Sequence, residues 1–128
     1  MNLLGIDWGE KKVGLAISEN GWIDSWGIIE TQKASAEIAQ LCQERKIEKI
    51  ILGRPEGRIV KAVEAFGKEL KRAIGLPLEL QDETLTSQDA AVRMKEVGKK
   101  QRERRVEDAF AAAVILEGYL ERKNKSEY

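Results

Sequence analysis

Strand-like and helix-like patterns of apolar residues follow one another along this chain in an order that few folds accommodate. The first three segments are strand-like and are separated by short turn signals, which predicts an antiparallel meander. Two stretches with helical spacing follow, each leading into a short apolar run, and a helix between two strands of one sheet requires a crossover connection. The predicted strands are residues 2–7, 13–18, 22–31, 48–53 and 78–81, and the predicted helices are residues 35–45, 57–74, 86–97 and 106–122.

The order βββαβαβ, followed by C-terminal helices, predicts an α/β fold in which helices cover the faces of a mixed five-stranded sheet. This is the order of a ribonuclease-H-like fold. The chain has 128 residues, which suits one domain at ~100–200 residues per domain, and we find no internal repeat or linker. We therefore expect residues 1–128 to form a single ribonuclease-H-like domain.

The second predicted strand has two very different faces. Its large residues share one face, whereas the other carries only Gly14, Ala16 and Ser18, so another element is expected to approach that face closely. The tryptophans lie in or beside predicted strands, and we expect them to pack in the core rather than to stack on bases. They are Trp8, Trp22 and Trp26.

The chain contains no histidine and a single cysteine, Cys42. These counts exclude Ser-His-Asp and Cys-His nucleophile systems, Cys/His zinc sites and any intramolecular disulfide. Cys42 lies in a helical pattern and is expected to be a small core residue. Enzymatic chemistry in this chain must therefore depend on carboxylates, which suit hard cations such as Mg²⁺ and Mn²⁺.

Three acidic residues from distant segments are candidates for such chemistry. Asp7 ends an apolar strand, where the alternative interpretation is a turn former. Glu83 follows the last strand with Asp82 beside it, and adjacent strand residues point to opposite faces, so only one of the two can belong to a given site. Asp108 precedes an apolar helical stripe, although it also suits the first turn of a helix as a partner of the helix dipole.

Three clustered carboxylates repel one another unless a cation neutralises them. A pair of divalent ions removes that repulsion and supports the transfer of a phosphoryl group to water. The residues thus suggest metal-assisted phosphodiester hydrolysis without histidine.

Lys and Arg total 22, as do Asp and Glu, so any surface that binds a polyanion must be a local patch. The basic run 99–105 precedes the helix that contains Asp108, and it is either a solvated loop or a phosphate-binding segment. The predicted nucleic-acid-binding residues are Lys11, Lys12, Arg54, Lys99, Lys100, Arg102, Arg104 and Arg105.

Four segments together resemble the YqgF family, also called RuvX, which comprises Holliday-junction-resolvase-like proteins and pre-16S rRNA nucleases with a ribonuclease-H-like fold. The matching segments are residues 5–18, 51–55, 82–87 and 108–120. The resemblance implies that Asp7, Glu83 and Asp108 are catalytic, metal-binding acids. It also implies an endonuclease dependent on Mg²⁺ or Mn²⁺ that acts on structured nucleic acid, foremost the 5′ end of the small-subunit rRNA precursor.

Two departures from the family pattern concern substrate binding. Family members usually carry Arg where this chain has Thr84, and a Leu-Pro-Leu-Asn-type loop where it has residues 54–57. Thr cannot reproduce the planar fork that Arg offers to a phosphate. We hypothesise that Arg54 partly replaces the missing Arg.

Other functions remain open at this point. The alternatives are a resolvase-type nuclease acting on branched DNA, or a non-catalytic RNA-binding or transcription factor with the same fold. Asp7 and Gly9, followed by a predicted hairpin, also resemble the phosphate loop of actin-like and sugar-kinase-like ATPases. Those proteins need two such domains with a nucleotide between them, and this chain has the length of one. We expect a cytoplasmic monomer or homodimer that binds nucleic acid and no membrane, because no segment has the ~20 apolar residues of a membrane helix and no signal peptide is recognisable.

Overall fold

The computed structural model describes residues 1–55, 57–82 and 106–126, with the side chains of the last helix described for residues 109–124. The strands are β1 (Leu3–Asp7), β2 (Lys12–Glu19), β3 (Trp22–Glu30), β4 (Lys49–Arg54) and β5 (Leu78–Asp82). The helices are the 3-10 turn η1 (Thr31–Lys33), α1 (Ala34–Glu44), α2 (Val60–Ile74) and α4 (Val106–Ser126). No helix in these ranges is long and apolar enough to cross a membrane.

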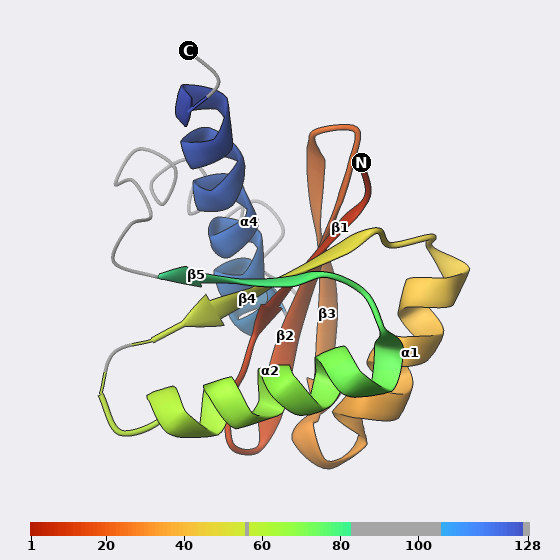
Figure 1. Cartoon of the computed structure of the whole chain (residues 1–128), viewed down its shortest axis with the longest axis vertical. Helices are drawn as coiled ribbons and strands as arrows, with labels where there is room; N and C mark the ends of the chain where they lie inside the picture. The colour runs from red at the N-terminus through yellow and green to blue at the C-terminus, as the bar shows by residue number, and fades with distance from the viewer. Residues whose placement is uncertain (56, 83–105, 127–128) are drawn as a thin grey trace.

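The strands form one mixed sheet in the order β3-β2-β1-β4-β5 (Figure 1). β1 pairs antiparallel with β2, and β2 pairs antiparallel with β3, as the meander predicted. β4 lies parallel to β1, and β5 lies parallel to β4, as the two crossover connections predicted. The carboxyl ends of β1, β4 and β5 therefore lie along one edge of the sheet, which we call the carboxyl edge.

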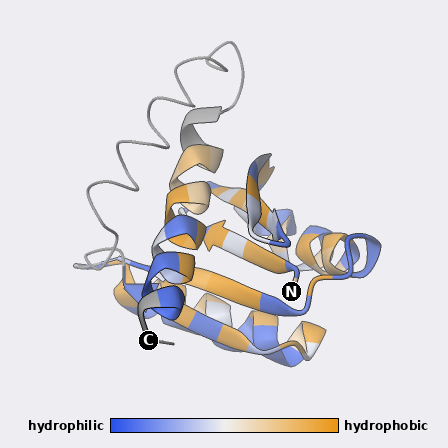
Figure 2. Cartoon of the chain, turned by 90° about the horizontal axis from the view of Figure 1, so that it is seen from above, coloured by the Kyte–Doolittle hydropathy of each residue, from blue (hydrophilic) through white to orange (hydrophobic). Residues whose placement is uncertain are grey.

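Each face of the sheet has its own hydrophobic cluster. α1 and α2 pack on one face over a cluster that includes Leu4, Ile6 and Leu52. α4 packs on the opposite face over a cluster that includes Leu3 and Ile51. The alternating strand residues thus separate into an α2 face and an α4 face, and the central strands between the helices are predominantly hydrophobic (Figure 2).

α4 approaches the small-residue face of β2, as the sequence predicts. Ala16 is completely buried in the α4 cluster. Neighbouring Gly5 of β1 allows the same approach, because a Cβ atom there would lie 2.6 Å from Cγ of Leu116 and 2.9 Å from the carbonyl oxygen of Ala112. The backbone of the helix therefore rests almost directly on β1.

The C-terminal part of α4 is attached to the amino ends of β4 and β5. Lys49 Nζ donates a hydrogen bond to Tyr119 Oη at 3.0 Å, and this bond is the main reason that the pKa of Lys49 is raised. Arg122 forms an ion pair with Glu79 at 2.8 Å. The predicted end of the helix near Arg122 was too early, because these contacts support the last turns and the helix continues to Ser126.

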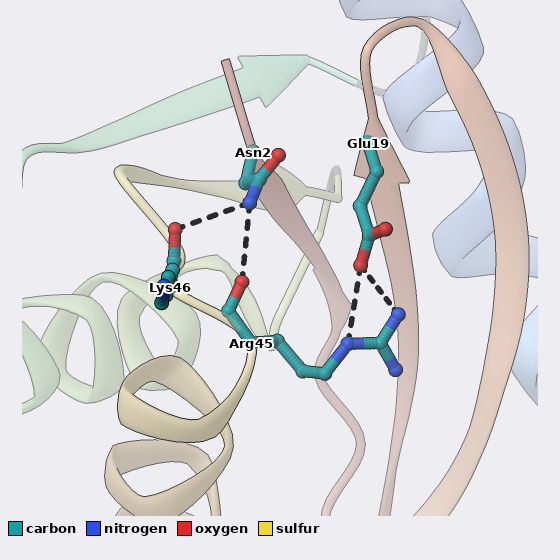
Figure 3. A network of polar contacts seen from close by, with 4 residues as sticks. All are labelled: Asn2, Glu19, Arg45 and Lys46. Carbon is teal, nitrogen blue, oxygen red and sulfur yellow. Dashed lines mark hydrogen bonds and ion pairs between the residues drawn. The ribbon is translucent and has the colours of Figure 1, made fainter.

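A polar network closes the same end of the sheet (Figure 3). The side-chain amide of Asn2 donates to the backbone carbonyl oxygens of Arg45 at 3.2 Å and Lys46 at 3.3 Å. Arg45 also forms an ion pair with Glu19 at the end of β2. The start of β1, the end of β2 and the connection from α1 to β4 are therefore held together away from the carboxyl edge.

Two details of the sequence prediction were wrong. Trp22 and Trp26 are 79% and 48% exposed, because β3 is an edge strand and the β2–β3 register is irregular near Trp26. Of the three tryptophans, only Trp8 packs against the core, with its ring 6.4 Å from that of Phe66.

The helix expected from residue 57 begins at Val60, since Gly57 has a φ of +96°, which a right-handed helix does not allow. The predicted helix 86–97 lies outside the described residues.

Candidate metal site and nucleic-acid interface

The register of the parallel strands brings the ends of β1, β4 and β5 together. Ile6 pairs with Leu52, so Asp7 stands beside Gly53 at the next position. Gly53 in turn pairs with Gln81 of β5. Asp7, Gly53 and Gln81 consequently form one row across three strands at the carboxyl edge.

Strand alternation places Asp7 on the α4 face, which it shares with Leu3 and Gly5 of the same strand. Asp7 is half-buried, and its register partner on β2 is Gly14. Glycines therefore flank this carboxylate on both neighbouring strands. Such surroundings leave room for a cation or a phosphate to approach.

α4 runs antiparallel to β1 and β4 on this face. Its Tyr119 contacts Lys49 at the amino end of β4, whereas Ala112, two turns earlier, lies over Gly5. Figure 1 shows the same arrangement, with the amino end of α4 directed toward the carboxyl end of β1. The first turn of α4, which contains Asp108, thus lies toward the carboxyl edge, although the side chain of Asp108 is outside the described residues.

The acidic pair after β5 is described only in part. Asp82 ends β5 and has the same parity as Leu78 and Leu80, which pack on the α2 face. Asp82 therefore does not share the face of Asp7. Glu83 lies outside the described residues, so its predicted role stays a prediction.

Gln81 is a candidate site residue that the sequence patterns did not indicate. Its side chain is completely buried, and neither amide atom has a hydrogen-bond partner in the described part of the chain. Gln81 lies on the α4 face, as does Glu79, which contacts Lys49 and Arg122. Gln81 lies between Leu80 and Asp82, and a polar residue beside a charged one at the end of a strand is typical of a solvent-facing position, so the sequence carried no signal of this burial.

The basic residues predicted to bind nucleic acid are partly at the same edge. Lys11 is exposed in the connection that follows Asp7, and Lys12 is exposed at the start of β2. Arg54 ends β4, and its Nε atom lies 3.8 Å from a carboxylate oxygen of Glu64 on α2. The other predicted residues, Lys99, Lys100, Arg102, Arg104 and Arg105, lie outside the described residues.

The donor chemistry at the carboxyl edge fits a hard divalent cation. Asp7 offers a carboxylate there, and oxygen ligands are those preferred by Mg²⁺ and Mn²⁺. The described residues contain no group of three His, Cys, Asp or Glu side chains that could hold a metal ion. A complete set of ligands therefore requires residues beyond those described.

The element order and the mixed five-stranded sheet are those of a ribonuclease-H-like fold, and a solved structure has the same fold. Thermus thermophilus RuvC, in complex with a Holliday junction substrate, superposes with a TM-score of 0.67 at 15% sequence identity. The superposition covers 94% of this chain and 95% of the RuvC chain.

Sequence comparison identifies the family within this class. The model of the RuvX family, described as Holliday junction resolvase, matches residues 1–122. A relative from Oenococcus oeni is 37% identical over 98% of this chain and 97% of its own, and one from Streptococcus mutans is 36% identical over 95% and 99%. Both are named for pre-16S rRNA nuclease activity. The chain belongs to the RuvX family and has a nuclease fold.

Proposed function

We propose that this protein is a divalent-metal-dependent endonuclease that processes the 5′ end of pre-16S rRNA in the cytoplasm. The observation that carries the proposal is the position of Asp7, on the α4 face of the carboxyl edge and between two glycines. The names of the relatives support the choice of substrate.

In this proposal Asp7, Glu83 and Asp108 hold Mg²⁺ or Mn²⁺ and are the catalytic acids. Divalent ions bound there supply activation of the attacking water and stabilisation of the leaving oxygen, the two-metal chemistry of many nucleases. The carboxylates position these ions from β1, the segment after β5 and the first turn of α4. Three segments that are distant in sequence thus contribute to one site, so the folded sheet is required for activity.

Basic residues around this edge bind the nucleic-acid backbone in the same proposal. Lys11 precedes β2, Lys12 begins β2 and Arg54 ends β4, and the run 99–105 is proposed to contribute further contacts. Contacts of this kind are made to phosphates and position the substrate without reading its sequence. Binding is therefore expected to weaken steeply as salt concentration rises.

Cleavage of branched DNA is the second candidate, favoured by the family description and by the fold shared with RuvC. A resolvase must cut two strands symmetrically, which requires a homodimer. A processing nuclease that makes a single cut can act as a monomer. The two candidates therefore differ in oligomeric state as well as in substrate.

A direct test offers the protein a labelled 5′ segment of pre-16S rRNA and a four-way DNA junction, side by side in Mn²⁺ and again in EDTA. The proposal predicts Mn²⁺-dependent cleavage of the RNA. Cleavage of the junction alone, by a dimer, would support the resolvase function instead. Binding of RNA without cleavage of either substrate would support a non-catalytic RNA-binding factor.

A further inference from the structure

The burial of the polar Gln81 side chain is not explained by its neighbours among the described residues. The side chain is completely buried at the end of β5, and its amide nitrogen and oxygen both lack a hydrogen-bond partner in the described part of the chain. A buried polar group without a partner destabilises a protein, and such groups are rare. A buried amide of this kind points to a partner outside the described residues, and a ligand is one partner that the protein alone would lack.

The place of Gln81 in the sheet suggests what that ligand is. Gln81 and Asp7 share the α4 face and stand in one row, with Gly53 of β4 between them. Gly53 has no side chain, so β4 places nothing between the amide and the carboxylate on this face. Two strand spacings separate the Gln81 and Asp7 backbones, about 10 Å.

We infer that Gln81 is a positioning residue for a divalent cation held at Asp7, and that its amide oxygen accepts a hydrogen bond from the hydration shell of that cation. Mg²⁺ and similar ions retain several waters in protein sites, and those waters need acceptors. An uncharged amide supplies one without adding to the repulsion among the carboxylates. The inference rests on the proposed function, since it requires the same metal site.

The chain also offers a matched control. The hydroxyl group of Ser18 is buried and without a partner among the described residues, as is the amide of Gln81. Ser18 pairs with Leu3 at the opposite end of β1 from Asp7. A substitution at Ser18 therefore removes a comparable unpaired group at a distance from the proposed cation.

The experiment measures Mn²⁺ affinity by calorimetry without nucleic acid, and melting temperature in EDTA and in Mn²⁺. Gln81→Met preserves length and removes both polar atoms; it is expected to weaken Mn²⁺ binding by about ten-fold. In EDTA the same variant should melt no lower than the wild type, because an unpaired buried group is removed. Gln81→Glu should retain the affinity or increase it, and Ser18→Ala should leave it unchanged.

The inference is overturned if Gln81→Met binds Mn²⁺ as tightly as the wild type, or if Ser18→Ala weakens binding equally. An additional variant, Asp7→Asn, distinguishes failure of the inference about Gln81 from failure of the proposed function. If Asp7→Asn alone loses Mn²⁺ binding, the metal site stands and Gln81 has no part in it. If the wild type binds no Mn²⁺, both the inference and the proposed metal site fail.

Discussion

We propose that Arg54 makes a phosphate contact in place of the Arg that the family pattern carries at position 84. The guanidinium of Arg54 lies 3.8 Å from the Glu64 carboxylate, and the side chains of Arg54 and Glu64 are 40% and 42% exposed. An exposed ion pair of this kind contributes little to stability, so a substrate phosphate can replace Glu64 as the partner. The resemblance to the family implies an Arg at the position of Thr84, and Arg54 offers the planar donor fork that Thr lacks.

Arg54→Ala is therefore expected to weaken binding of the pre-16S 5′ segment. The plot of log affinity against log salt concentration should lose about one unit of slope, as expected for one lost phosphate contact. Fluorescence anisotropy at several salt concentrations measures both quantities. Arg72→Ala, an exposed position near the end of α2, is the control and should change neither. Equal slopes for Arg54→Ala and the wild type would disprove the role of Arg54.

Cys42 is predicted to be inert at neutral pH. Burial raises the pKa of its thiol from 9.0 to about 11, and only the thiolate reacts readily. The folded protein should therefore react slowly with a thiol reagent at pH 8, and the unfolded protein quickly. Rapid labelling of the folded protein would show that the thiol is accessible and ionised.

The same raised pKa has a consequence for stability. The unfolded state loses the thiol proton near pH 9, whereas the folded state retains it to about pH 11. The contribution of Cys42 is thus fully present below pH 9 and decreases between pH 9 and pH 11. Urea unfolding of the wild type and Cys42→Ala over this range should show a smaller pH-dependent loss of stability for the variant.

At the level of single residues, local patterns predicted the position of Asp7 at the end of a strand and the burial of Cys42. It did not predict Gln81, because the partners that would explain a buried amide come from other segments. The exposed positions of Trp22 and Trp26 were missed for a related reason. The order of the strands decides which strand lies at the edge, and local hydrophobicity does not encode that order.

The contact between α4 and β1 decides where the first turn of the last helix lies. Gly5 allows this contact, since a Cβ atom would lie 2.6 Å from Cγ of Leu116 and 2.9 Å from the backbone oxygen of Ala112. The side chain of Leu116 can adjust, but the backbone of the helix can move only as a unit. Any substitution at Gly5 therefore displaces the element that carries Asp108.

Gly5→Ala is expected to lower the free energy of unfolding by about 1–3 kcal/mol through overpacking. Leu116→Ala should also destabilise the protein, because it leaves a cavity in the core. The double variant should be more stable than the sum of the two effects, since the smaller side chain makes room for the new methyl group. Urea unfolding measures all three variants, and strictly additive effects would contradict the close contact.

At the level of elements, the strand and helix patterns were sufficient to predict the sheet. Every strand appears within two residues of its predicted limits. The small-residue face of β2 also predicted that another element packs closely there, which α4 does. The boundaries of α2 and α4 were less predictable, because they depend on the backbone conformation of Gly57 and on contacts of Arg122 with a distant strand.

The whole molecule combines zero net charge with a basic group of residues at one edge. Lys11 and Lys12 follow Asp7 at the turn into β2, and Arg54 ends β4 on the opposite face of the sheet from the Asp7 carboxylate. Attraction of nucleic acid therefore depends on this edge and not on the protein as a whole. In the proposed function, these residues bind the phosphate backbone near the proposed metal site.

The most direct test of this account is the Mn²⁺-dependent cleavage rate of the pre-16S 5′ segment by the wild type, Asp7→Asn and the control Asp24→Asn. Asp24 is exposed on β3, away from the proposed site. The account predicts that Asp7→Asn lowers the rate by at least about 100-fold, because several kcal/mol of transition-state stabilisation depend on the metal. Asp24→Asn should cleave as the wild type does. Cleavage by Asp7→Asn at the wild-type rate would contradict the account.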